Sequence, residues 1–165
     1  MHATVSVFFM ELKVFVNLTH LKCSQISLSY LKIFVWLEHL IKIQLEYIVK
    51  SSPAILFNRL STPSGLSEWF ADNVNNKKGI YSFFWDGSEE KAKMLGKKAD
   101  EFIKFRWLYD EEDGNDYFFE FRIIVDPLTK EVALVVTDYV EEDEVDESKQ
   151  LWDTQVDELL TLLGS

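Results

Sequence analysis

The side chains that most often perform catalysis are concentrated at the start of this chain of 165 residues. All three histidines (His2, His20 and His39) and the only cysteine (Cys23) lie in the first 42 residues. The rest of the chain therefore cannot supply a Ser-His or Cys-His pair, or a His/Cys metal site. Acid–base catalysis there would rest on Asp, Glu, Lys or Tyr, and none of these stands at a recognisable active-site spacing. We expect no catalytic residue, no metal and no cofactor.

One acidic segment, "YDEEDGNDYFFE", partly matches a calcium-binding loop. With Gly114 at the sixth loop position, Glu111, Asp113 and Glu120 fall at the third, fifth and twelfth positions. Tyr109 then occupies the first position, where the motif requires Asp, and strands rather than helices are predicted on both sides. We predict a hairpin loop here, and we interpret the other carboxylates as a solvated surface.

A pattern of aromatic residues is the remaining signal, because 15% of the chain is aromatic, with 13 Phe, 6 Tyr and 5 Trp. Large rings alternate with polar residues in several segments, which is the period of a half-buried strand. The rings predicted to share the inner face are Phe83, Trp85, Phe105, Trp107, Phe119 and Phe121. For any single ring, a filled core is the simpler interpretation. Together they also favour a cavity, because a curved sheet and one helix often leave space that rings line incompletely.

The net charge of −11 argues against nucleic-acid binding, which needs a patch of Lys and Arg. The charge is uneven: residues 1–42 hold four Lys and two Glu, whereas residues 43–165 hold 13 basic and 26 acidic residues. An anionic membrane is disfavoured for the same reason. A single cysteine excludes an intramolecular disulfide, so we expect a cytoplasmic protein.

Residues 1–41 differ in character from the rest of the chain. They are apolar, contain no Pro or Gly, and show no clean period. The best candidate for a membrane span, residues 26–40, is interrupted by Lys32 and Glu38 and is shorter than the ~20 apolar residues required. The segment is either an extension that packs on the domain or the product of a start codon assigned too far upstream. We favour the second interpretation, because the segment supplies no pattern that the domain needs.

Two short helices are predicted after a first strand over residues 43–50. In "SSPAILFNRLS" and "STPSGLSEWFAD", a Ser or Thr that can cap a helix precedes a Pro at the first helical position. Trp69 and Phe70 are expected on the inner side of the second helix, and Gly65 is expected to keep its outer side small.

Six further strands and a long helix complete the predicted order, β-α-α-β6-α. The strands are expected in "DNVNNKKG", "IYSFFW", "EEKAKMLGKKAD", "EFIKFRWLY", "YFFEFRIIV" and "VALVVTDYV". In the terminal segment, Val145, Trp152, Val156 and Leu159 recur at helical spacing, and Gly164 marks the end. A sheet with one apolar face must be covered, and this helix is the element long enough to cover it. The sequence thus predicts an α+β fold with a curved antiparallel sheet wrapped around a C-terminal helix.

The segments "TPSGLSEWFAD", "FFWDGSEEKAK" and "LWDTQVDELLTLLGS" resemble the START-like (SRPBCC) superfamily, which has the helix-grip fold of birch-pollen allergen. The resemblance covers residues 42–165 and is greatest to the chaperone-ATPase-activator-like branch and to uncharacterised Bacteroidetes proteins. It implies one START-like domain over residues 42–165, with residues 1–41 outside it. It also implies a cavity between the sheet and the helix, which relatives use for lipids, sterols, polyketides or hormones.

The main functional hypothesis is a non-catalytic domain that binds a small hydrophobic ligand, lipid-like or aromatic, in this cavity. The predicted ligand-binding residues are Trp69, Phe70, Phe83, Trp85, Phe105, Trp107, Phe119, Phe121, Trp152 and Val156. The alternative is a protein-interaction module that resembles the chaperone activators and presents its acidic surface to a basic partner. A cavity above ~300 Å³ would favour the ligand, and a filled core would favour the protein partner.

Overall fold

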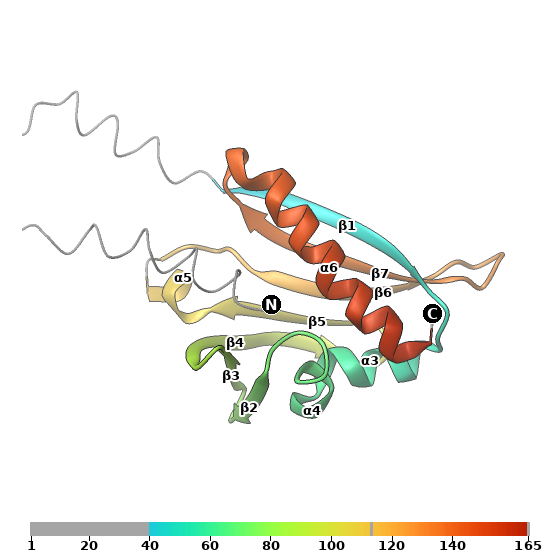
Figure 1. Cartoon of the computed structure of the whole chain (residues 1–165), viewed down its shortest axis with the longest axis horizontal. Helices are drawn as coiled ribbons and strands as arrows, with labels where there is room; N and C mark the ends of the chain where they lie inside the picture. Colours follow the sequence, from blue (N-terminus) through green and yellow to red (C-terminus); the bar gives the residue numbers. More distant parts are fainter. Residues whose placement is uncertain (1–39, 113, 165) are drawn as a thin grey trace, which may run out of the picture.

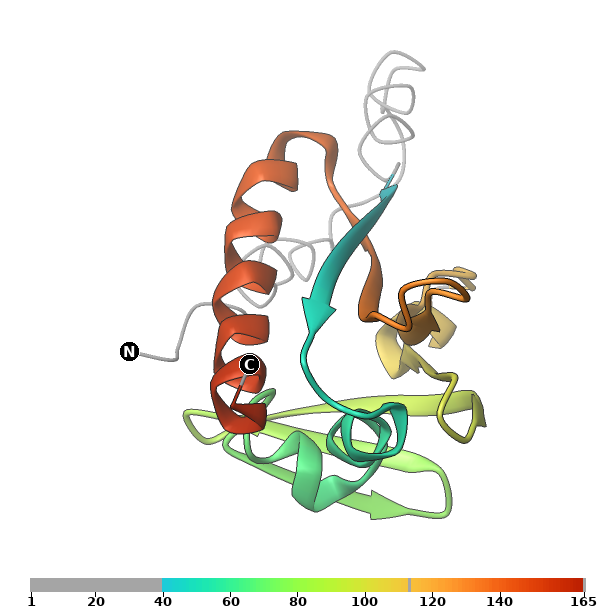
Figure 2. The same cartoon turned by 90° about the vertical axis from the view of Figure 1, so that its right-hand side faces the viewer.

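The computed structural model describes residues 40–112 and 114–164. Seven antiparallel strands form one sheet in the order β1-β7-β6-β5-β4-β3-β2. Figure 2 shows that the sheet bends between β1 and β4 and that helix α6 lies on the inside of the bend. The predicted α+β class and the helix-grip arrangement are therefore confirmed.

The elements follow the predicted order, with two short additions, α5 between β5 and β6 and η1 before α6 (Figure 1). Their bounds are β1 Ile41–Val49, α3 Pro53–Ser61, α4 Pro63–Leu66, β2 Asn73–Lys77, β3 Ile80–Trp85, β4 Ser88–Lys98, β5 Phe102–Trp107, α5 Leu108–Glu112, β6 Phe119–Val125, β7 Val132–Val140, η1 Glu142–Glu144 and α6 Val145–Leu163.

Both short helices begin as their sequences predict. The hydroxyl of Ser52 accepts a hydrogen bond from the Ile55 N–H at 3.4 Å, and that of Thr62 accepts one from the Gly65 N–H at 3.0 Å. Each Pro stands at a position where no helical N–H is needed. Thr62 thus ends α3 and starts α4, which breaks the chain direction sharply between the two helices.

Gly65 has a different role from the one predicted. It is buried rather than on an outer side, and a Cβ placed on it would lie 2.5 Å from the Asn58 carbonyl oxygen and 2.7 Å from the Arg59 Cα. Only a residue without a side chain allows α3 and α4 to approach this closely. The glycine is therefore required by the contact between the helices.

The tight turns of the sheet agree with their residue types. Lys78-Gly79 and Asp86-Gly87 all have positive φ, which is the conformation of two-residue hairpin turns of type I′. At the other end of the domain, Gly164 has a φ of 70° and closes α6 in the left-handed conformation.

The connection from β5 to β6 differs from the predicted hairpin loop. Residues 108–112 form the single helical turn α5, and Asp110 on this turn is buried. Strand β6 accordingly begins at Phe119 rather than at Tyr117. The acidic composition predicted a solvated loop, but the backbone of Asp110 instead accepts a hydrogen bond from the Asn115 N–H at 2.8 Å, which closes the turn.

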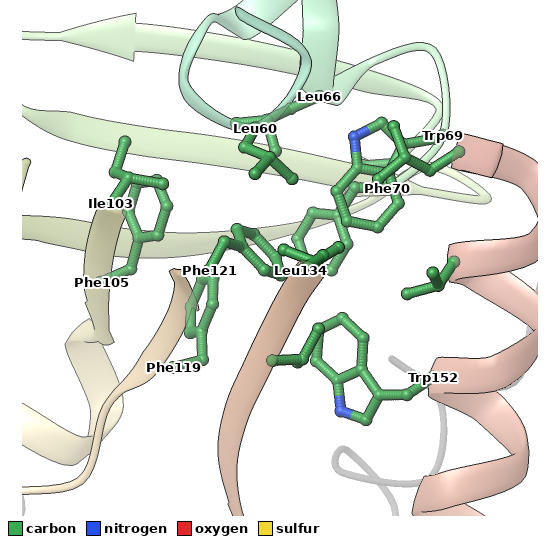
Figure 3. Close-up of a cluster of buried hydrophobic side chains, with 14 of the residues drawn as sticks. Leu60, Leu66, Trp69, Phe70, Ile103, Phe105, Phe119, Phe121, Leu134 and Trp152 are labelled. Carbon is green, nitrogen blue, oxygen red and sulfur yellow. The ribbon is translucent and has the colours of Figure 1, made fainter. Parts of the chain in front are cut away.

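Aromatic rings fill the core between the sheet, α4 and α6 (Figure 3). The Phe70 ring meets the Phe83 ring edge-on at 5.3 Å and stacks on Trp152 of α6 at 5.9 Å. Trp69 packs against Phe121, and its indole N–H donates to the Arg59 carbonyl oxygen at 3.2 Å. The segment after α4 therefore seals one end of the space between sheet and helix.

Replacement of Trp69 by alanine tests this sealing role. Because the indole is 4% exposed and its N–H is satisfied, Trp69→Ala should lower the free energy of unfolding by about 3–5 kcal/mol. Urea denaturation of the full chain measures the loss. Leu128→Ala, at a side chain that is 89% exposed, is the control and should change stability by less than about 0.5 kcal/mol. A similarly small loss for Trp69→Ala would contradict the sealing role.

Candidate functional site

One cavity is lined by residues of the first half of α6, the α5 turn and the neighbouring strand ends. Figure 1 shows where these elements lie. The volume of the cavity is about 90 Å³. The aromatic part of its wall consists of Phe70, Trp85, Trp107, Tyr109, Tyr117, Phe118, Tyr139 and Trp152. The polar part includes Glu90, Asp110, Asp138, Ser148 and Gln155. The site is thus an aromatic cavity with three carboxyl groups in its wall.

The ten predicted ligand-binding residues fall into two groups. Four of them line this cavity: Phe70, Trp85, Trp107 and Trp152. The other six are buried in the core: Trp69, Phe83, Phe105, Phe119, Phe121 and Val156. Their burial agrees with the predicted inward face. Helix α4 is shorter than predicted, because it ends at Leu66, and Trp69 and Phe70 lie in the turn after it. The cavity is smaller than the ~300 Å³ above which a ligand would be favoured over a protein partner, so its volume alone does not favour the ligand hypothesis.

Asp138 is the polar residue at the centre of the site. It stands on the inward alternation of β7, and its carboxylate accepts hydrogen bonds from the Trp152 indole N–H at 3.0 Å and from the Tyr139 N–H at 2.9 Å. The side chain keeps some accessible surface because it faces the cavity, while protein surrounds it on its other sides. Burial, with a smaller contribution from the Asp110 carboxyl, raises the pKa of Asp138 to about 6, although the two hydrogen bonds act to lower it.

Tyr109 shows that the cavity has a negative electrostatic potential. Its ring stacks on Trp107 with 6.1 Å between centroids and 8° between planes. Burial raises the pKa of the Tyr109 hydroxyl, and the carboxyl groups of Asp110, Glu90 and Asp138 raise it further. Three separate elements, β4, α5 and β7, therefore bring negative charge to one small space.

No Lys, Arg or His belongs to the described part of the cavity wall. Lys104 lies over the Phe118 ring at 3.6 Å, but it extends from the outer alternation of β5 and its ammonium is 3.8 Å from Glu120. Arg106 and Arg122, predicted to pair with carboxylates on the outer face, contact Asp116 and Glu120 at 3.0 and 2.8 Å. These three basic groups thus contact outer-face carboxylates, although Lys104 also lies over the ring of Phe118, a residue of the cavity wall.

Sequence reasoning missed the polar half of the site. Asp138 carried a usable signal, because it continues the inward alternation of Leu134 and Val136 in "VALVVTDYV". Tyr109 likewise continues the alternation of Phe105 and Trp107. No pattern in the sequence indicated that Asp110 is buried. Its burial depends on the helical turn α5, and the acidic composition of this segment predicted a loop instead.

Two further classes of site were searched for in the described residues. Within residues 40–112 and 114–164, no group of three or more His, Cys, Asp or Glu side chains could hold a metal ion. None of the helices in these ranges combines the length and the apolar character that a membrane crossing requires.

A comparison with known protein families shows which family model the chain matches. A family model for the START-like superfamily domain matches residues 37–165. A solution structure from Bacteroides fragilis is similar at 38% identity, with a TM-score of 0.56, over 74% of this chain and 90% of that protein. No curated protein sequence matches the chain.

More distant structures share the fold. The Aha1 dimer from Colwellia psychrerythraea is similar at 15% identity, with a TM-score of 0.63, over 74% of this chain and 96% of that one. A Mesorhizobium loti protein is similar at 18% identity, with a TM-score of 0.61, over 75% of this chain and 97% of that one. At these identities the likeness establishes the helix-grip fold alone.

The raised pKa of Asp138 predicts that the stability of the folded protein depends on pH. In the unfolded chain this group ionises near pH 4, whereas in the folded protein it ionises near pH 6. Between these values the folded state binds more protons, so its stability falls as pH rises through this window. Relative to Asp138→Asn, the wild type should lose about 2–3 kcal/mol between pH 4 and pH 7.

Urea denaturation of both proteins across this pH range measures the difference, in which the titrating groups that do not face Asp138 cancel. Those that face Asp138 are Asp110 and Tyr109 on α5 and Glu90 on β4. A difference that stays constant with pH would contradict the raised pKa.

Proposed function

The chain belongs to the START-like superfamily, and on this basis we propose that it is a non-catalytic domain that binds a small molecule in the cavity beside α5 and α6. The aromatic wall of the cavity is the observation that carries the proposal. Rings that line an enclosed space bind apolar groups, while a few polar groups set their orientation. We assign this function to residues 42–165, and the single cysteine supports a reducing, cytoplasmic setting.

The size of the cavity limits the ligand. A volume of about 90 Å³ holds a group of only a few non-hydrogen atoms, whereas drug-sized ligands occupy ~300 Å³ or more. The packed rings of Phe83, Phe105 and Phe121, all 0% exposed, leave no room for a lipid chain along the rest of the sheet. The ligand is therefore a small molecule, or the compact end group of a larger one.

A variant that fills the cavity tests the proposal. Ser148 lies on the cavity wall on α6, so Ser148→Phe should occupy the space and reduce ligand affinity at least about tenfold. Native mass spectrometry of the full chain detects molecules that co-purify, and quenching of tryptophan fluorescence reports binding because three of the wall rings are indoles.

Thr154→Phe is the matched control, since it makes a similar change from hydroxyl to ring on the exposed side of the same helix. It should leave binding unchanged. If the wild type carries no small molecule and a broad ligand screen changes neither fluorescence nor melting temperature, the proposal is wrong. Equal binding by Ser148→Phe and the wild type would place the ligand elsewhere.

The filled core and one charged segment support a second candidate, an interaction module for a basic protein. The acidic segment, residues 141–147, runs through η1 into the first turn of α6. Burial and the neighbouring Glu141, Asp143 and Glu147 raise the pKa of Glu144. These carboxylates thus repel one another, and a basic partner would relieve the repulsion.

Charge reversal distinguishes the second candidate from the first. The double variant Glu142→Lys, Asp143→Lys should abolish capture of a defined basic protein by the immobilised full chain. Wild-type capture should itself be lost in ~0.5 M salt, because exposed charges are screened. The control is Glu46→Lys, Asp157→Lys, which changes the net charge equally at exposed positions elsewhere. A capture that neither salt nor the acidic-segment variant reduces would contradict this candidate.

A further inference from the structure

We propose that the cavity selects an organic cation, such as a quaternary or protonated amine, over an uncharged molecule of the same shape. This inference rests on the proposed function, because it names the chemical class of the ligand at the same site. It is carried by two observations: the wall presents aromatic rings, and its charged groups are all acidic.

The aromatic rings of the wall differ in orientation and do not form a flat layer. The planes of Trp85 and Trp107 meet at 59°, with 6.3 Å between centroids, while Tyr109 stacks in parallel on Trp107. Trp152 lines the same space from the helix on the opposite side. The face of an aromatic ring attracts a cation, most strongly for Trp, and the attraction grows when the cation is removed from water.

The carboxyl groups supply the complementary charge. Asp138, Asp110 and Glu90 reach the wall from three elements. Each oxygen of Asp138 accepts one hydrogen bond from the protein, which leaves further lone pairs for a ligand. The Trp152 and Tyr139 donors to Asp138 are both neutral N–H groups, and a partly buried carboxylate held by neutral donors is unfavourable. A bound cation would compensate for this cost, and an uncharged ligand would not.

Other classes of ligand fit the wall less well. A phosphate or carboxylate group would meet three carboxyl groups and no basic side chain within the described wall. A bare metal ion requires several oxygen ligands that converge on one point, and no such group is found among the described residues. An alkylated ammonium group combines positive charge with an apolar surface, and its few non-hydrogen atoms suit a volume of about 90 Å³.

The test compares two probes of the same shape that differ in charge. Choline chloride and neohexanol, its uncharged carbon analogue, are titrated into the full chain at constant ionic strength. Tryptophan fluorescence and the indole N–H resonance of Trp152 report binding at the site. Choline should bind at least about tenfold more tightly than neohexanol.

Variants locate the source of this preference. Asp138→Asn should reduce choline affinity about tenfold and leave neohexanol affinity unchanged. Glu90→Gln makes the same kind of change without disturbing the Trp152 hydrogen bond, and it should weaken choline in the same direction. Glu89→Gln is the matched control, because Glu89 lies on the same strand, is exposed and pairs with Lys91 instead of lining the cavity.

The outcomes separate this inference from the proposed function. Equal affinity for both probes, or tighter binding of neohexanol, would overturn the preference for a cation while leaving a small-molecule site in place. A preference for choline that survives both carboxyl substitutions would also overturn it. If neither probe binds, the cation inference is wrong, and the comparison of natively bound molecules between the wild type and Ser148→Phe decides the proposed function separately.

Discussion

The side chain of Trp152 joins helix α6 to the sheet and to the segment that follows α4. Its ring stacks on Phe70 at 5.9 Å and meets Phe121 of the sheet edge-on at 5.8 Å, and its N–H donates to Asp138 at 3.0 Å. Together with the buried Val156 and Leu159, Trp152 therefore holds α6 on the concave face. It also divides the interior, because closely packed rings lie on one side of it and the cavity lies on the other.

The fold could be predicted from local patterns because each pattern has a local cause. Alternation sets the face of a strand, Thr62 and Pro63 set the start of α4, and the Asp86-Gly87 pair sets a hairpin turn. The exceptions depended on contacts that are distant or cooperative. Gly65 was placed on the wrong side because its neighbour is another helix, and α5 was missed because its acidic residues are typical of a loop.

The candidate site was predictable only in part. Alternation identifies which rings face inward, but it does not show where along the strands the helix crosses. Phe105 and Trp107 are two residues apart on β5, yet the first is in the core and the second lines the cavity. The boundary between core and cavity is set by the crossing of α6, and this is a property of the tertiary structure.

The acceptor used by Trp152 supports the proposal that the cavity binds a ligand. The buried indoles of Trp69 and Trp85 donate to the backbone carbonyl oxygens of Arg59 and Phe70, which are neutral acceptors. A neutral acceptor would satisfy Trp152 equally well and would avoid the cost of a buried carboxylate. The protein instead retains Asp138, at a position where its charge disfavours the folded state above pH 6. A feature that lowers the stability of the empty protein is explained if a bound cation restores that stability.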